Sequence, residues 1–166
     1  MAEDKIVKPI KTCRVCRGTV FTKVLTLGPT PLANAFLTKE QLDQAEQYFP
    51  LDLCFCETCT LVQLGHIVDP EVLFSNYVYV SSTSQVFVKH FENFANDVYT
   101  RFKPNKDSLV IDIGSNDGIL LKPFNKLGAK VLGIEPASKI ANVAKKAGIP
   151  TLPEFFSKKL ASRIIR

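Results

Sequence analysis

The segment LVIDIGSNDGILL, residues 109–121, most constrains what this chain can fold into. Its apolar start is typical of a buried parallel strand, and a polar loop bracketed by glycines and a helix over 119–127 are expected to follow. Such a loop presents backbone N–H groups at a helix N-terminus, and glycine lets a ligand approach the main chain. The next predicted strand, 130–134, ends in Glu135, which can accept hydrogen bonds from two ribose hydroxyls. The pattern predicts a nucleoside-binding half-site.

The spacing of the glycines favours one class of nucleoside. Dinucleotide-binding loops follow G-x-G-x-x-G, which makes room for a pyrophosphate, whereas Asp112 to Gly118 reads D-x-G-x-x-x-G. The carboxylates of Asp112 and Asp117 would repel a pyrophosphate, and they suit a ligand that carries an ammonium group. S-adenosylmethionine offers both a ribose for Glu135 and a charged amine for Asp112.

The predicted donor-binding residues lie in this loop and after the next strand: Asp112, Gly114, Ser115, Asn116, Asp117, Gly118, Glu135 and Pro136. The alternative is a strand–turn–helix that binds no ligand and whose acids cap the helix. We favour the methyl-donor site because the acids and the glycines occur together.

Four of the five cysteines form a second pattern. Cys13 and Cys16 make one C-x-x-C motif, and Cys56 and Cys59 make another. Two such motifs supply four thiolates at the spacing that tetrahedral Zn²⁺ takes. Because cysteine fills all four positions, no coordination position stays open, and the pattern predicts a structural zinc site.

Other uses of these cysteines fit less well. An odd number of cysteines and an expected cytosolic location argue against disulfides. A redox site is disfavoured because it needs one C-x-x-C motif that opens a helix in a thioredoxin-like setting, whereas this chain has two motifs. Cys54 alternates with Cys56 along a short apolar strand, so we expect it to be a small core or sheet residue. It remains the competing candidate for the ligand position of Cys56.

Composition excludes several classes of function. No apolar run approaches the roughly 20 residues that span a bilayer, and the N-terminus, MAEDKIVKPIK, has no apolar stretch that would direct export. We therefore expect a cytoplasmic protein without a membrane partner. The formal charge is +5, but the basic residues alternate with acids and form no stripe, so no nucleic-acid partner is expected.

The chain is expected to have four parts: a flexible lead-in over 1–11, a zinc-binding module over 12–66, a linker segment and helix over 67–103, and a nucleoside-binding part over 104–166. Within the zinc module, 28–31 reads as a rigid turn and 38–47 as helix-prone.

The linker segment carries clear helix signals. A short helix is expected to start at Asp69–Glu71, where an acid is followed by proline. Residues 76–84 are β-rich and then rich in hydroxyls, and Ser84 is the expected N-cap of a helix that runs to Phe102. Strands and helices then alternate to the end of the chain, which implies a parallel sheet.

The chain resembles the sugar C-methyltransferase-like family in several separate motifs: CRVC, LGPTPLANAF, CETCTLVQLGH, DPEVLFSNYVYVSSTS, VIDIGSNDGILL and GIEP. Members are class I S-adenosylmethionine-dependent enzymes with an N-terminal zinc-binding domain, and the best-known ones methylate a carbon of a nucleotide-linked deoxy-keto sugar. The resemblance implies an α/β fold with a zinc-ribbon-like module and the first half of a Rossmann-like class I methyltransferase domain, with three parallel strands.

The resemblance also implies roles for single residues. The four paired cysteines match zinc ligands, the loop residues match the donor site, and a tyrosine near the reacting groups matches Tyr77 or Tyr79. The alternative is that these tyrosines pack on the core as strand aromatics. The family's glutamate–histidine base pair and substrate domain lie beyond position 166, so neither His66 nor His90 matches the base, and little or no turnover is expected from this chain alone.

The leading hypothesis is methyl transfer from S-adenosylmethionine to a carbon of a nucleotide-linked sugar or a similar small molecule. One alternative is a zinc-ribbon binding module with a non-catalytic nucleotide fold. The other is an NAD-dependent oxidoreductase, which the missing G-x-G-x-x-G pattern and Asp112 disfavour.

Overall fold

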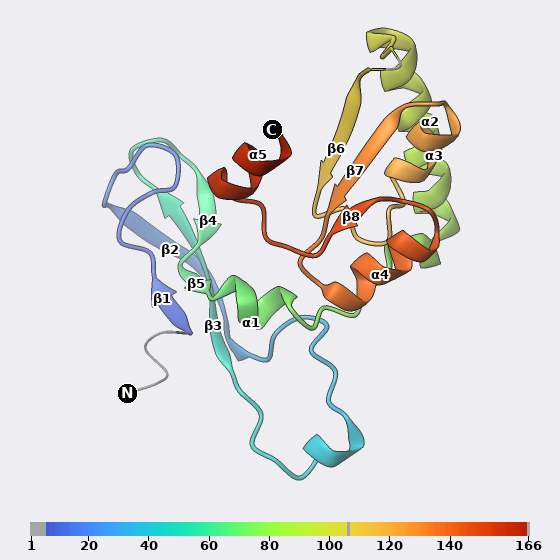
Figure 1. Ribbon diagram of the computed structural model, residues 1–166. Coiled ribbons are helices and arrows are strands. Elements are labelled where there is room, and N and C mark those ends of the chain that lie inside the picture. Colours follow the sequence, from blue (N-terminus) through green and yellow to red (C-terminus); the bar gives the residue numbers. More distant parts are fainter. Residues whose placement is uncertain (1–5, 106, 166) are drawn as a thin grey trace. The chain divides into compact units, whose positions relative to one another are not determined.

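The computed structural model describes residues 6–105 and 107–165, and the chain divides into two units between Leu73 and Phe74 (Figure 1). The N-terminal unit contains two small antiparallel sheets, and the C-terminal unit contains a parallel sheet with helices. The described residues include no helix that is long and apolar enough to cross a membrane.

The larger sheet of the N-terminal unit has the strand order β2-β3-β4. Its strands are β2 (Phe21–Thr30), β3 (Phe49–Cys56) and β4 (Val62–Leu64). In β3, Asp52, Cys54 and Cys56 are buried and alternate with half-buried apolar residues, as the two-residue period of a strand requires. Cys54 is therefore a buried sheet residue, as predicted.

The second sheet joins segments far apart in the chain, because β1 (Val7–Pro9) pairs antiparallel with β5 (His66–Val68). Part of the expected lead-in over 1–11 therefore belongs to a sheet, while residues 1–5 lie outside the described residues. The sequence offers no local sign of this pairing, since three residues are too few to show a period.

Two other expectations for this unit need correction. The expected rigid turn over 28–31 is largely strand, because β2 continues to Thr30 with register shifts on the way. The helix-prone stretch 38–47 forms only the 3-10 turn η2 (Lys39–Gln41), where the N–H of Thr38 donates to Gln41 Oε1 at 2.9 Å. The expected helix start is confirmed: α1 (Pro70–Phe74) begins where Asp69 Oδ1 accepts the N–H of Glu71 at 2.9 Å.

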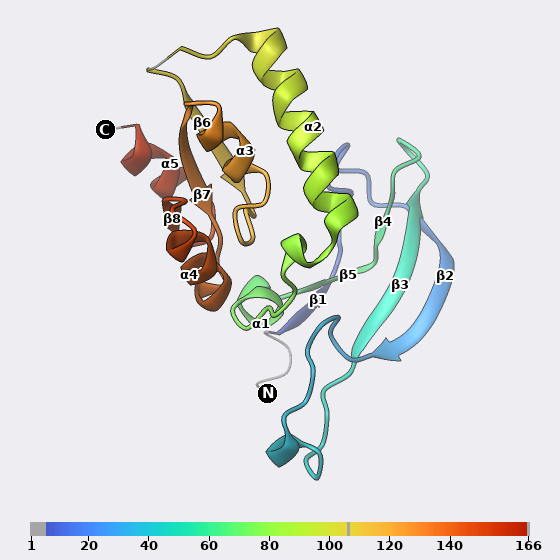
Figure 2. The ribbon, with the colours of Figure 1, turned by 90° about the vertical axis from the view of Figure 1, so that its right-hand side faces the viewer.

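The C-terminal unit has a three-stranded parallel sheet of order β6-β7-β8 (Figure 2), which confirms the predicted parallel pairing. Its strands are β6 (Leu109–Ile113), β7 (Lys130–Ile134) and β8 (Thr151–Leu152). Its helices are α2 (Gln85–Phe102), α3 (Leu121–Lys126), α4 (Ser138–Lys146) and α5 (Lys158–Ile164).

Three of the helices, α2, α3 and α4, pack against one face of this sheet. Ala95 of α2, Phe124 of α3, Val131 of β7 and Ala144 of α4 belong to one buried apolar cluster. On the opposite face the side chains of β6 are exposed: Leu109, Ile111 and Ile113 are 46%, 42% and 57% exposed. β6 is also an edge strand, since no strand of the described residues pairs with its outer edge.

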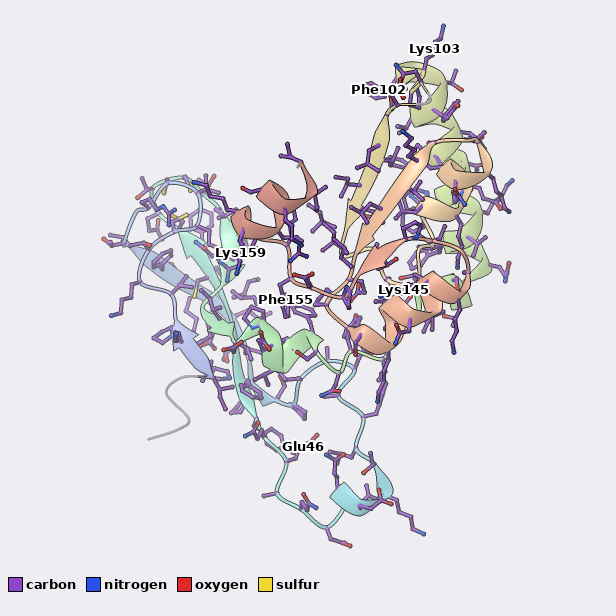
Figure 3. The ribbon with its side chains drawn as sticks, in the orientation of Figure 1. Glu46, Phe102, Lys103, Lys145, Phe155 and Lys159 are labelled. Atoms are coloured by element: carbon purple, nitrogen blue, oxygen red, sulfur yellow. The ribbon has the colours of Figure 1, made fainter. Side chains whose placement is uncertain are left out.

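The segment before α2 differs from expectation. Residues 76–80 form no strand, and Ser81–Thr83 form the 3-10 turn η3. The N-cap prediction is confirmed, because Ser84 Oγ accepts the N–H of Phe87 at 3.4 Å. The helix ends where Lys103 takes a left-handed conformation with φ of 45°, next to the exposed Phe102 (Figure 3).

Candidate functional site

The four paired cysteines meet in the N-terminal unit. All four sulfurs lie within 4.8 Å of one another, and the Cys13–Cys59 and Cys16–Cys56 sulfur pairs are each 3.6 Å apart. The sulfurs of a tetrahedral site with Zn–S bonds of about 2.3 Å are separated by about 3.8 Å, so the cluster fits a zinc ion. Cys54, the competing candidate, is not part of this cluster.

The two C-x-x-C motifs share one backbone geometry. The N–H of Arg17 donates to the carbonyl of Cys13 at 3.1 Å, and the N–H of Thr60 donates to the carbonyl of Cys56 at 2.8 Å. Arg17 and Thr60, each directly after the second cysteine of a motif, take left-handed φ values of 64° and 63°. Each chain turn therefore brings its two sulfurs to the same side.

Backbone donors favour the thiolate form at two of these positions. The N–H of Cys16 is the main cause that lowers the pKa of the Cys13 thiol to about 6, against the opposing effect of burial. The N–H of Cys59 likewise lowers the pKa of Cys56. Since thiolates are the form that binds metal, the main chain prepares these sulfurs for zinc.

In the C-terminal unit, the β6–α3 loop (residues 114–120) has an open side and a packed side. A side-chain carbon at Gly114, where φ is 77°, would meet nothing within 4 Å, so a ligand has access to the main chain there. At Gly118, where φ is 79°, the same carbon would come within 3.1 Å of Ile149. Gly114 is therefore placed for a ligand, and Gly118 is required for packing.

Glu135 joins this loop to the turn after β7. The carboxylate is 6% exposed, and it accepts the N–H of Asn116 at Oε2 and the N–H of Ala137 at Oε1, both at 2.9 Å. Each oxygen keeps further acceptor capacity, so ribose hydroxyls can still be bound. The structural role of Glu135 was not evident from the sequence.

Asp112 is half-buried at the end of β6, one strand away from Glu135. Burial raises the pKa of Asp112, and the negative charge of Glu135 raises it further. The carboxylates of Asp112 and Glu135 create a negative potential at the ends of the two strands. This potential favours a cationic ligand and disfavours a pyrophosphate.

Two other loop residues, Ser115 and Asp117, are deeply buried. Asp117 is 1% exposed and forms an ion pair with Lys122 at 2.9 Å, so its charge is largely compensated. Within the described residues, Asp117 Oδ1 and the hydroxyl of Ser115 are buried without a hydrogen-bond partner. Ser115 also packs against Gly133, where an added side-chain carbon would come within 2.5 Å of its hydroxyl.

The tyrosine segment (residues 77–81) contacts this loop through the main chain. The carbonyl of Tyr79 accepts a hydrogen bond from Asn116 Nδ2 at 2.8 Å, and the N–H of Ser81 donates to Asn116 Oδ1 at 2.9 Å. The Tyr77 and Tyr79 rings meet edge to face with centroids 6.5 Å apart. The structure thus brings the tyrosine segment to the predicted donor site, although only the resemblance had linked them.

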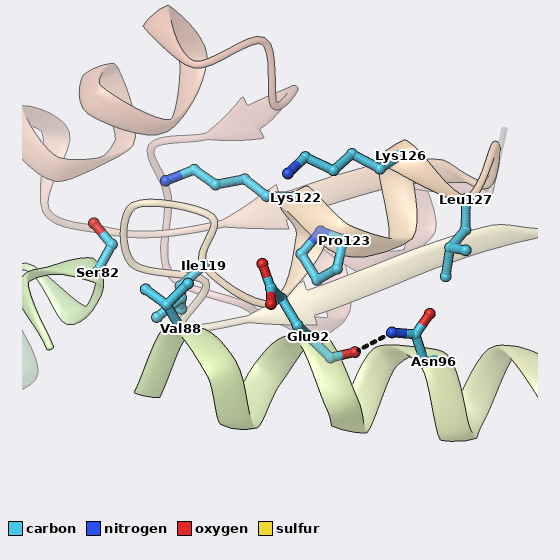
Figure 4. Close-up of a pocket in the computed structure, with 9 residues that line it drawn as sticks. All are labelled: Ser82, Val88, Glu92, Asn96, Ile119, Lys122, Pro123, Lys126 and Leu127. Atoms are coloured by element: carbon cyan, nitrogen blue, oxygen red, sulfur yellow. Dashed lines mark hydrogen bonds between the residues drawn. The ribbon is translucent and has the colours of Figure 1, made fainter. Parts of the chain in front are cut away.

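A cavity of about 390 Å³ adjoins the site between α2 and α3 (Figure 4). Lys122 and Lys126 line it from α3, and Glu92 lines it from α2. Lys122 connects the cavity to the loop, because the same ammonium group pairs with Asp117.

The two histidines lie elsewhere. His90 is on α2, with its ring against those of Phe91 and Phe94. His66 begins β5 in the N-terminal unit, with Nδ1 3.8 Å from Asp52 Oδ2.

Comparison with known proteins supports the zinc site. Residues 13–74 match the family model Methyltransf_13, described as "Putative zinc binding domain". The chain is 36% identical over 159 residues to C-methyltransferase NovU of Streptomyces niveus, a match that covers 96% of this chain and 38% of that relative. The chain thus spans well under half the length of the relative it matches. These matches support a relationship to the sugar C-methyltransferase-like family with an N-terminal zinc-binding domain.

Proposed function

We propose that the C-terminal unit holds S-adenosylmethionine for the methylation of a carbon atom, and that the zinc site of the N-terminal unit is structural. The observation that carries this proposal is the pair of carboxylates, Asp112 and Glu135, at the ends of neighbouring strands beside the open Gly114. The relative is itself named a C-methyltransferase.

Each of these residues has a distinct task in the proposed site. Asp112 receives the ammonium group of the donor, and its negative charge is stabilised by that contact. Glu135 accepts the ribose hydroxyls with the acceptor capacity that the N–H groups of Asn116 and Ala137 leave. The other predicted donor-binding residues, in the β6–α3 loop and at Pro136, form the rest of the same site. The bound donor supplies a methyl group on a positively charged sulfur, and the negative potential of the two carboxylates suits that charge.

We propose further that the parallel sheet belongs to a Rossmann-like domain. The exposed face of β6 and its unpaired outer edge support this, because isolated domains rarely expose contiguous apolar strands. The match to 38% of a longer relative is consistent with further strands that pair there.

The proposed acceptor is a small molecule, and a nucleotide-linked deoxy-keto sugar is the first candidate. A carbon next to a ketone becomes nucleophilic when a base removes its proton. Tyr77 and Tyr79 are the candidates in this chain to contact the reacting groups, since their segment is bonded to the β6–α3 loop.

Ligand-dependent thermal unfolding tests the proposed donor. A ligand present at a hundred times its Kd stabilises the folded state by about 2.7 kcal/mol. For a domain of the size of the C-terminal unit, this raises the Tm by roughly 10 °C or more. We expect S-adenosylmethionine to raise the Tm of the zinc-loaded chain, and S-adenosylhomocysteine, which lacks the sulfonium charge, to raise it less. A shift with NAD and none with S-adenosylmethionine would favour an oxidoreductase instead.

The substitution Asp112→Asn is expected to move stability and binding in opposite directions. Because the folded-state pKa of Asp112 is raised, its ionisation costs stability at pH 7, and this cost disappears as the pH falls through that pKa. The variant should therefore have a higher Tm than the wild type near pH 7 and no advantage at acidic pH. Donor affinity should fall roughly tenfold or more, since a hydrogen bond to a charged group contributes about 1.5–3 kcal/mol.

Asp107→Asn is the matched control, because Asp107 is an exposed acid of the same unit, 3.9 Å from Lys130. It should leave both donor affinity and Tm close to wild type. Equal donor affinity in the Asp112→Asn variant and the wild type would remove Asp112 from the proposed site.

A further inference from the structure

The side chain of Asn116 is nearly buried and makes three hydrogen bonds. It is 9% exposed, and its Oδ1 accepts the N–H groups of Ser81 and Asp117, both at 2.9 Å. Its Nδ2 donates to the carbonyl of Tyr79 at 2.8 Å. Because both lone pairs of the amide oxygen are occupied, small movements of the tyrosine segment would break good bonds.

These contacts imitate the pairing of two strands. A residue of a parallel neighbouring strand bonds to the carbonyl of one residue and to the N–H of the residue two positions later, and the side chain of Asn116 does the same with Tyr79 and Ser81. Val80, between them, is extended, with φ of −107° and ψ of 114°. One amide side chain therefore takes the place of a neighbouring strand, which explains why this β-rich segment joins no sheet.

The backbone of Asn116 is held from the other side. Its φ of 50° lies in the left-handed region, which asparagine tolerates better than most residues. Its N–H donates to Glu135 Oε2 at 2.9 Å. One residue thus connects the tyrosine segment, the β6–α3 loop and the carboxylate proposed to bind the ribose.

We infer that Asn116 is a positioning residue that couples the donor site to the tyrosine segment, so that a ligand engaging Glu135 also sets the place of Tyr77 and Tyr79. The identity of that ligand rests on the proposed function, whereas the attachment of the segment to Asn116 does not. Asn116 itself need not touch the reacting atoms.

Two substitutions separate the contacts. Asn116→Gly removes the side chain and tolerates the left-handed backbone, so the N–H to Glu135 can stay in place. Asn116→Asp keeps an acceptor for the N–H of Ser81 but removes the donor to the carbonyl of Tyr79. Asn96→Ala is the control, because Asn96 is an exposed residue of α2 that bonds only within its own helix, to the carbonyl of Glu92.

Amide hydrogen exchange tests the attachment without any ligand. In the zinc-loaded wild-type chain, the amide of Ser81 should be protected. In Asn116→Gly it should exchange at least tenfold faster, while Val131 in the buried core keeps its protection and shows that the fold is intact. Asn116→Asp should retain most of the protection at Ser81. Unchanged exchange of Ser81 in the glycine variant would overturn the inference.

Fluorotyrosine NMR tests the coupling, with the resonances assigned from Tyr77→Phe and Tyr79→Phe variants. In the wild type, S-adenosylmethionine should shift the resonances of Tyr77 and Tyr79. In Asn116→Gly these shifts should be largely lost even at donor concentrations that saturate the variant, a split that general destabilisation would not produce. Equal shifts in both proteins would contradict the coupling. If the wild type binds no donor, the proposed function fails, and exchange at Ser81 still decides whether Asn116 holds the segment.

Discussion

Removal of zinc is expected to unfold the N-terminal unit and to leave the parallel sheet of the C-terminal unit intact. The described part of the N-terminal unit has four buried apolar side chains, Phe49 and the three cysteines Cys13, Cys54 and Cys56. A unit with so small a core needs another source of stability. Structural zinc contributes about 10–16 kcal/mol in small zinc-binding peptides, which far exceeds what this core can supply.

Two neighbouring cysteines of β3 provide a matched pair of variants. Cys56→Ser removes one of the four clustered sulfurs, so the chain should lose zinc and the amides of β2, β3 and β4 should lose their exchange protection. Cys54→Ala removes a buried sulfur outside the cluster, so zinc content should stay at one ion per chain and the cost should be only about 1 kcal/mol. Zinc content and amide exchange of both variants are the measurements.

Two results would contradict a structural zinc site. One is a zinc-free chain in which the sheet β2-β3-β4 keeps its exchange protection. The other is loss of zinc in Cys54→Ala to the same extent as in Cys56→Ser, which would mean that the Cys54 sulfur is also needed to hold the zinc.

Glu135→Gln is expected to have the largest effect on the C-terminal unit. The carboxylate accepts two buried N–H groups, from Asn116 and Ala137, whereas glutamine offers one oxygen and a donating NH₂ group. One N–H is left without an acceptor, which costs about 1–3 kcal/mol of stability. The substitution also removes the negative charge beside Asp112, so donor affinity should fall on the order of a hundredfold.

The same variant tests the electrostatics of the site. Since the charge of Glu135 helps to raise the pKa of Asp112, Glu135→Gln should lower that pKa, which carboxyl NMR measures during a pH titration. Glu154→Gln is the control, because Glu154 is a more exposed acid of the same unit that pairs with Arg163. An unchanged pKa of Asp112 together with unchanged donor affinity would rule out the proposed pair.

Features with a strong local signature were predictable from the sequence. The cysteine spacing predicted the cluster, because two C-x-x-C turns can place four sulfurs together only in a few ways. The strands of the parallel sheet and the start of α2 at Ser84 were also evident, since apolar runs and an N-cap residue are local signals.

Features that depend on distant contacts were not predictable. Residues 76–80 have strand-forming side chains, but the carbonyl of Tyr79 bonds to the side chain of Asn116, 37 residues later in the chain. The pairing of β1 with β5 is equally non-local. The ion pair of Asp117 with Lys122 was not predictable either, because it depends on how the loop turns the side chain into the unit.

Titration calorimetry of the zinc-loaded wild-type chain with S-adenosylmethionine tests the central claim most directly. We predict saturable binding at one site per chain, an affinity that falls as Asp112 is protonated at acidic pH, and loss of most of that affinity in Glu135→Gln. A donor site in this chain would be ruled out if the wild-type chain gave no saturable heat with S-adenosylmethionine while zinc was bound and amide exchange showed the parallel sheet intact.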